Sequence, residues 1–282
     1  RLLTSSLAAA ALFGTAAHAA TVTPNTWQQV NTPVTIGGEV ITSSVNTNAT
    51  ASAFWNNSTA DGSSCLNIGC FVTKTGGFSS NANSPALFNP VYLGNNNGSA
   101  FGNFSLSAGP AGSASQPVTM LAEVAGNASR NWLGWYDASI TDLSQLNSSN
   151  WGVIFNGAAT TGASTTFTPT TNFGFWMAYV TGPTLSVSNI RFLTNTGLQS
   201  GDSAGNQHFA LFARSAAAAN VLPAQFWLGV EDLPLGNADK DYNDMIVSFE
   251  VVPVPEPGSF ALMALGLGAF AIMRRRMSAA KS

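Results

Sequence analysis

The residues best suited to chemistry in this chain are the acids of segment 231–244, which reads EDLPLGNADKDYND. Five of its fourteen residues are Asp or Glu, and Lys240 is the one basic residue that opposes them. At about 5 Å apart, two like charges repel by roughly 3 kcal/mol at an effective dielectric of 20. If the fold gathers these carboxylates, they therefore need a cation, protons or wide spacing.

Oxygen ligands at this density suit a hard cation, and calcium is the one that we expect outside the cell. We therefore predict a calcium site in this segment, called the acidic loop below. The predicted ligands are the oxygen-bearing side chains of Glu231, Asp232, Asp239, Asp241, Asn243 and Asp244. The alternative is that these side chains cap turns and bind backbone amides, as Asp and Asn commonly do.

The acidic loop matches an EF-hand loop only in part. Positions 1, 3 and 5 of that template are filled by Asp239, Asp241 and Asn243. Glu250 falls on position 12, but position 6 requires a glycine and holds Asp244, and residues 245–252 alternate like a strand. We therefore expect a D-x-D-x-N-D loop between two strands, with Glu231 or Asp232 folding back from the end of the preceding strand.

Cys65 and Cys70 are the two cysteines of the chain and lie in a stretch rich in Gly and Ser. In an oxidising compartment this pattern favours one local disulfide, which closes a short loop and contributes about 2 kcal/mol or less. A metal site and a reactive thiol are the alternatives. A metal site needs more N or S ligands, and a thiol nucleophile needs a nearby base.

No set of residues predicts catalysis, so we expect a protein that is not an enzyme. A glycosidase needs two carboxylates about 5 to 10 Å apart in a cleft, whereas a pair such as Asp239 and Asp241 lies in a turn. A Ser–His–Asp site would have to use His208, which lies in an apolar strand pattern. The sequence contains no phosphate-binding glycine loop, zinc motif or dinucleotide fingerprint.

Most of the middle of the chain alternates apolar and polar residues with the period of a β-strand. Residues 173–180 are apolar on both faces, which predicts a central strand buried on two sides. The other predicted strands are 118–124, 132–136, 151–155, 185–188, 207–213, 226–231 and 245–250. Short helices are expected only at 139–146 and 214–220. This pattern predicts an all-β fold, an antiparallel β-sandwich of jelly-roll-like form.

Both ends of the chain carry hydrophobic segments that we exclude from this fold. Residues 1–19 are rich in Leu and Ala and end in Ala17-His18-Ala19, a pattern that a signal peptidase cuts. Near the other end, Pro255-Glu256-Pro257 precedes the uncharged apolar run 258–273, which is followed by Arg274, Arg275 and Arg276. As a helix this run is roughly 24 Å long, somewhat short of a bilayer core of about 30 Å. The arginines are expected on the cytoplasmic side.

The tail at 253–282 resembles the PEP-CTERM sorting domain of Gram-negative bacteria in three ordered elements, namely the PEP motif, the apolar transmembrane helix and the arginine cluster. The resemblance implies that an exosortase, an integral-membrane cysteine protease, processes the tail near Pro255-Glu256-Pro257. The protein would then reach the cell surface or the extracellular polysaccharide matrix after a transient stay in the inner membrane. The alternative is a plain membrane anchor that is never cut.

Without both ends the chain is acidic, since residues 20–253 contain five basic and twelve acidic residues, a formal charge of about −7. Such a charge argues against nucleic acid and anionic lipid as partners. We divide this part into an Asn/Ser/Thr-rich β lobe at 20–116 and a β-sandwich domain with the acidic loop at 117–252. The lobe either belongs to the same sandwich, forms a second small domain or is partly mobile.

A second resemblance covers roughly residues 117–252. The sequences GVEDL at 229–233 and DKDYND at 239–244, followed by an apolar strand, are similar to the signature of an uncharacterised domain family of bacterial surface proteins. Residues 131–136 and 208–212 resemble earlier strands of that family. The resemblance implies a β-rich extracellular module and no known reaction.

These features together predict an exported, exosortase-processed protein of the cell surface or matrix, associated with exopolysaccharide or biofilm and stabilised by calcium. The first alternative is a calcium-dependent, lectin-like module in which calcium and a tryptophan contact a glycan. A secreted hydrolase is the third hypothesis.

Overall fold

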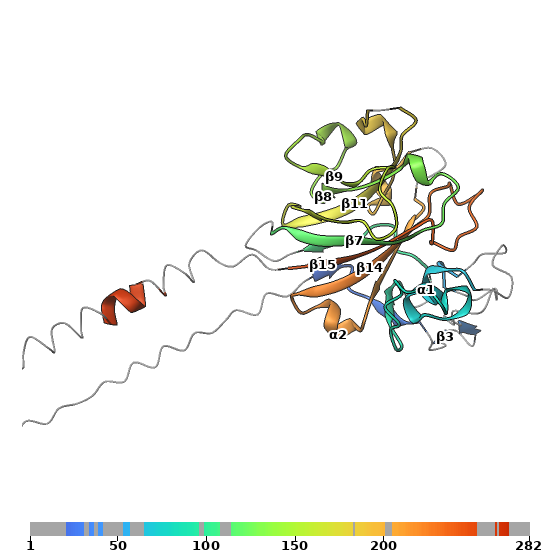
Figure 1. Cartoon of the computed structure of the whole chain (residues 1–282), viewed down its shortest axis with the longest axis horizontal. Helices are drawn as coiled ribbons and strands as arrows, with labels where there is room; N and C mark the ends of the chain where they lie inside the picture. Colours follow the sequence, from blue (N-terminus) through green and yellow to red (C-terminus); the bar gives the residue numbers. More distant parts are fainter. Residues whose placement is uncertain are drawn as a thin grey trace, which may run out of the picture.

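The protein is described by a computed structural model, and its described residues are 21–30, 34–36, 39–41, 53–56, 65–95, 99–107, 114–182, 184–200, 205–252, 263 and 265–270. Within them, two antiparallel sheets pack face to face (Figure 1). The predicted all-β antiparallel sandwich is therefore confirmed. The predicted signal peptide at 1–19 lies outside the described residues.

The first sheet contains, in spatial order, β1 (Thr21–Thr23), β6 (Ser105–Ser107), β11 (Asn172–Tyr179), β8 (Asn131–Asp137) and β9 (Trp151–Phe155), and β12 (Ile190–Leu193) also pairs with β11. The second sheet contains β10 (Ser164–Phe167), β7 (Gln116–Glu123), β15 (Met245–Val251), β14 (Ala224–Val230), β13 (Phe209–Ala213), β5 (Val91–Leu93) and β2 (Trp27–Gln29). A separate pair is formed by β3 (Val34–Ile36) and β4 (Glu39–Ile41).

The described helices of the β domain are short. The two α-helices are α1 (Ile68–Thr73) and α2 (Ala216–Ala219). The 3-10 turns are η1 (Gly76–Phe78), η2 (Ala128–Arg130), η3 (Leu143–Gln145), η4 (Val187–Asn189) and η5 (Thr196–Leu198). The helices expected at 139–146 and 214–220 therefore correspond to η3 and α2, each shorter than expected.

The main core forms where the alternating apolar side chains of the two sheets meet. Phe226 and Leu228 of β14 point into this core, and Phe175 of β11 meets Phe249 of β15 with ring centroids 5.0 Å apart. On the other face of β11, Trp176 is buried in a smaller apolar cluster. Strand β11 is therefore buried on both faces, as its continuous apolar sequence predicted.

The outer face of the second sheet is covered by residues from the first hundred positions. Trp227 and Ile246 project from this face into a cluster that contains Trp55 and Ile68. In addition, β1 and β6 belong to the first sheet, while β2 and β5 belong to the second. Four strands of the 20–116 segment thus pair within the two large sheets and α1 packs against the second one (Figure 1), whereas β3 and β4 pair only with each other.

Two details of the strand predictions are wrong. Regular alternation over the predicted strand 118–124 would place Ala122 on the same face as Met120. The pairing of β7 with β15 shifts register between them, however, and Ala122 lies in the outer cluster. One extra residue in a strand reverses the face of every residue that follows. Residues 185–188 were expected to be a strand, but they lead into η4, where the Ser186 amide donates to Asn189 Oδ1 at 2.9 Å.

Candidate metal site

The two halves of the acidic loop meet because β14 and β15 are antiparallel neighbours. Val230 at the end of β14 pairs with Met245 at the start of β15. Asp232 follows the end of β14 and Asp244 precedes the start of β15, so the two residues lie at the same end of this strand pair. The Asp232 amide donates a hydrogen bond of 2.8 Å to Asp244 Oδ2. The segment is thus a loop between two strands, and Asp232 at its start lies against Asp244 at its end.

The rest of the acidic loop turns back over Glu231. Lys240 and Tyr242 have φ values of 60° and 56°, in the left-handed region that side chains other than glycine adopt infrequently. The Lys240 amide donates to Glu231 Oε2 at 3.1 Å, and the buried Tyr242 hydroxyl donates to the Gln207 carbonyl at 2.8 Å. These bonds hold the sharp turn that returns residues 239–241 to the end of β14.

Carboxylate oxygens converge in two groups that share Glu231. One group adds Asp239 and Asp241, the other adds Asp232 and Asp244, and within each group the oxygens lie within 4.8 Å of one another. All six predicted ligands line one pocket of about 370 Å³. None of the described residues that line this pocket is basic. The arrangement fits a cation with oxygen ligands.

The electrostatics of the pocket disfavour the ionised acids. Glu231 is 1% exposed, and its burial, followed by the charge of Asp244, raises its pKa. Burial, followed by the charge of Asp232, also raises the pKa of Asp244. Both shifts have the sign that desolvation and like charges produce. At neutral pH the pocket therefore favours protons or a bound cation over free carboxylates.

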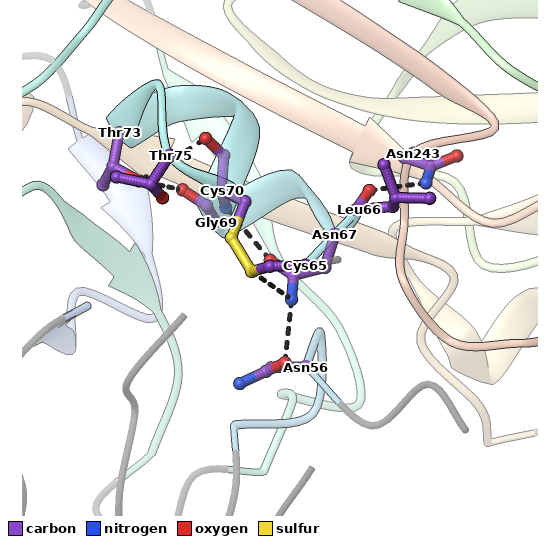
Figure 2. The surroundings of a disulfide bond; sticks show 9 residues. All are labelled: Asn56, Cys65, Leu66, Asn67, Gly69, Cys70, Thr73, Thr75 and Asn243. Atoms are coloured by element: carbon purple, nitrogen blue, oxygen red, sulfur yellow. Dashed lines mark hydrogen bonds between the residues drawn. A yellow bond between two sulfur atoms is a disulfide. The ribbon is translucent and has the colours of Figure 1, made fainter. Parts of the chain in front are cut away.

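The Asn243 side chain holds the loop in shape. Its amide nitrogen donates to Asp241 Oδ2 and, at 2.6 Å, to the Leu66 carbonyl oxygen, as Figure 2 shows for Leu66. The Asn243 backbone amide also donates to Asp241 Oδ1 at 3.0 Å. Asp241 therefore accepts hydrogen bonds from loop amides, which is the turn-stabilising alternative, while it also lines the acidic pocket.

Cys65 and Cys70 form a disulfide, with their Cα atoms 6.1 Å apart (Figure 2). The bridge closes the turn that begins α1. Asn67 caps this helix, because its side-chain oxygen accepts from the Cys70 amide at 3.0 Å. In this state neither cysteine offers a thiolate to a metal or a substrate.

Two polar residues near the acids were not predicted. Asn131 Nδ2 donates to Asp232 Oδ2 at 2.7 Å. Glu123 pairs with Met245 in the sheet, and burial, followed by the charge of Asp232, raises its pKa to about 7. Glu123 reaches the site because β7 pairs with β15, whereas Asn131 reaches it from β8 of the first sheet. The local sequence around these two residues carries no signal for either contact.

Two residues considered above lie elsewhere. His208 is completely buried, and burial lowers its pKa to about 4. Glu250 pairs with Gln225 within the second sheet and is not among the residues that line the pocket. Glu250 therefore takes no place in the acidic loop, in agreement with the rejection of the EF-hand template.

Within the described residues the fold is an all-β sandwich with an acid-lined pocket where β14 and β15 meet, and the tail follows directly after β15. Residues 253–276 match the PEP-CTERM protein-sorting motif. This chain is thus an exosortase-sorted, exported protein, and the motif implies sorting to the cell surface. No curated protein and no solved structure matches the chain. The resemblance of residues 117–252 to a surface domain family stays a prediction.

The structure describes only a small part of the apolar tail. Residues 263 and 265–270 are helical, and their large side chains are exposed, for example Leu265 at 70% and Phe270 at 66%. No helix within the described residues is long and apolar enough to span a membrane. The membrane-spanning helix expected at 258–273 stays a prediction.

Proposed function

We propose that this exported protein is a non-catalytic component of the cell surface or extracellular matrix, and that calcium bound in the acidic pocket stabilises its sandwich. One observation carries the proposal. Glu231 is 1% exposed, yet its carboxylate belongs to both groups of converging carboxylates, and none of the described residues that line the pocket is basic. A divalent cation removes the repulsion that this arrangement otherwise creates.

Calcium fits the chemistry of the pocket better than zinc or copper. Its ligands are carboxylate and amide oxygens, whereas zinc and copper sites use nitrogen or sulfur donors. Calcium accepts six to eight oxygens in a flexible geometry, which suits acids contributed by a loop and two strand ends. Asp239 is exposed at the rim of the pocket and provides a route by which the ion enters.

The non-catalytic part of the proposal rests on the environment of the reactive groups. His208 lies in the core, where a substrate does not reach it. The acids cluster at one strand junction, so they supply no separate acid and base across a cleft. We accordingly assign the acids to stability and expect the matrix polysaccharide to be the environment of the protein.

A calcium-dependent glycan-binding role is the second candidate. Asn127 and Asn237 line the same pocket as the carboxylates. Amide side chains at the rim of a calcium site can donate to and accept from sugar hydroxyls. If this role holds, binding to a polysaccharide requires calcium and is lost when either asparagine is replaced by alanine.

Thermal unfolding of the exported protein, purified from the cell surface, tests the proposal. Extracellular calcium modules bind with Kd values of about 10⁻⁴ to 10⁻³ M. Calcium at 10 mM should then stabilise the fold by about 1.4 to 2.7 kcal/mol relative to excess chelator. For a domain of this size the melting temperature rises by roughly 3 to 10 °C. An unchanged melting temperature at 10 mM calcium rejects calcium stabilisation.

A further inference from the structure

The disulfide-closed turn lies directly against the acidic loop. Two hydrogen bonds join them, since the Ile68 amide donates to the Asp241 carbonyl at 2.9 Å and the Leu66 carbonyl accepts from Asn243 Nδ2 at 2.6 Å. Leu66 also lines the metal pocket. The segment between the cysteines thus forms part of the wall of the proposed calcium site. Figure 2 shows its contact with Asn243.

The turn keeps its shape through the covalent bridge and through Asn67. Cys65 has a φ of 47°, a left-handed conformation that is unfavourable for a residue with a side chain. Asn67, which lies between the cysteines, caps α1 and also donates to Asn56 Oδ1 at 2.8 Å. Reduction of the disulfide removes the covalent constraint that holds Cys65 and the adjacent Leu66 in place.

A second contact links the turn to the strand that leads into the site. A Cβ atom placed on Gly229 would lie 2.4 Å from Ile68 Cδ1 and 2.4 Å from the Tyr242 carbonyl oxygen. Ile68 therefore packs directly on β14, two residues before Glu231. The turn touches both the strand end and the loop that supply the carboxylates.

From these contacts we infer that the Cys65–Cys70 disulfide positions the acidic loop for calcium, so that calcium binds tightly only to the oxidised protein. The inference rests on the proposed calcium site and names the part of the fold that controls its affinity. Loss of the ordered Leu66 and Ile68 contacts should weaken calcium binding about tenfold or more, since each hydrogen bond accounts for several-fold in affinity. By linkage, calcium should make the disulfide harder to reduce by the same factor.

Calorimetric titration of the exported protein with calcium, well below its melting temperature, tests this inference. The oxidised protein is compared with protein reduced by a trialkylphosphine. The phosphine gives two electrons to the disulfide, and one water molecule supplies the oxygen of the phosphine oxide and the two protons of the thiols. The Cys65→Ser, Cys70→Ser double variant provides a reductant-free comparison. We expect a Kd about tenfold higher in both thiol and serine forms, and recovery of the original Kd on reoxidation.

If the disulfide stabilised only the fold, its loss would lower the melting temperature in chelator and leave the calcium Kd of the folded protein unchanged. A Kd within twofold in the fully reduced, folded protein therefore overturns the inference. Absence of calcium binding to the oxidised protein overturns the proposed calcium site instead. If the reduced protein and the double-serine variant do not fold, the inference is tested by the rate at which the disulfide of the folded, oxidised protein is reduced. We expect calcium to slow reduction of the disulfide in the wild type but not in Glu231→Gln. Equal slowing in both proteins, or no slowing in either, rejects the inference.

Discussion

The rings of His208 and Phe192 stack with centroids 3.6 Å apart and planes at 12°. His208 lies just before β13 of the second sheet, whereas Phe192 belongs to β12 of the first. The stacked pair therefore joins the two sheets within the core. His208 Nδ1 lies 3.3 Å from the Glu231 carbonyl oxygen, and Nε2 has no hydrogen-bond partner among the residues described.

This environment predicts a loss of stability in acid. Burial lowers the pKa of His208 to about 4, while the Glu231 carbonyl acts weakly in the opposite direction. The depressed pKa means that the neutral ring is favoured in the folded state, so its contribution is complete above about pH 6.5 and falls as the pH drops toward 4. The full shift of the His208 pKa corresponds to a decrease of about 3 kcal/mol in the free energy of unfolding. Urea unfolding at several pH values with saturating calcium should show this slope in the wild type and a smaller one in His208→Gln.

Replacement of Glu231 by glutamine should separate calcium binding from intrinsic stability. The amide keeps the shape of the side chain but removes a buried acid whose ionisation is unfavourable. In chelator we expect Glu231→Gln to be at least as stable as the wild type, and in 10 mM calcium we expect most of the thermal stabilisation to disappear. Glu250→Gln, which changes an acid outside the pocket, is the matched control. A variant that keeps the full calcium response contradicts the assignment of Glu231.

Calcium binding should release protons at neutral pH. The raised pKa of Glu231 means that the calcium-free pocket holds a proton near pH 7, and bound calcium displaces it. Apparent affinity should accordingly rise between pH 6 and pH 8. Calorimetry in two buffers of different ionisation enthalpy counts the released protons. Identical binding enthalpies in the two buffers would contradict this prediction.

Gly229 should be intolerant of even a methyl group. A Cβ at this position would meet Ile68 Cδ1 and the Tyr242 carbonyl, and a carbonyl of the main chain does not move aside freely. Gly229→Ala should lower the free energy of unfolding by about 1 to 3 kcal/mol. Gly236→Ala, where the added Cβ has no atom within 4 Å, should change it by less than about 0.5 kcal/mol. Chemical denaturation of both variants in chelator gives the comparison.

The sorting motif predicts the mass of the surface form. Processing near Pro255-Glu256-Pro257 removes the apolar run and the arginine cluster. Intact mass spectrometry of the protein released from the cell surface should therefore show a chain that ends near residue 257. A mass that still includes Arg274–Arg276 would support the uncut membrane anchor.

Local pattern in the sequence was sufficient for the long strands, such as β7, β11, β14 and β15, and for the position of the acidic loop between β14 and β15, but not for short strands such as β5 and β10. Alternation at 226–231 and 245–250 gave β14 and β15, and their antiparallel pairing explains why Asp232 and Asp244 meet. Glu250 could be rejected as an EF-hand ligand from the missing glycine and the following strand pattern. These inferences depend on residues close together in the chain.

The remaining features depend on contacts between distant segments. Nothing near Leu66 in the sequence indicates that its carbonyl accepts from Asn243, 177 residues later. Asn131 and Glu123 approach Asp232 only because β7 and β8 fold beside the loop. The bulge that turns Ala122 outward likewise reflects pairing with β15 rather than any property of its own segment.

Strand β15 is hydrogen-bonded along both edges, to β14 and to β7, and it ends at Val251, two residues before the sorting motif. Val252 is fastened to the buried Gln116, whose Oε1 accepts from the Val252 amide at 2.6 Å. While the tail is held, any pull on the protein enters through β15. Such a force runs along the strand and loads both ladders in shear at once, so the fold resists it with many bonds together instead of opening them one at a time.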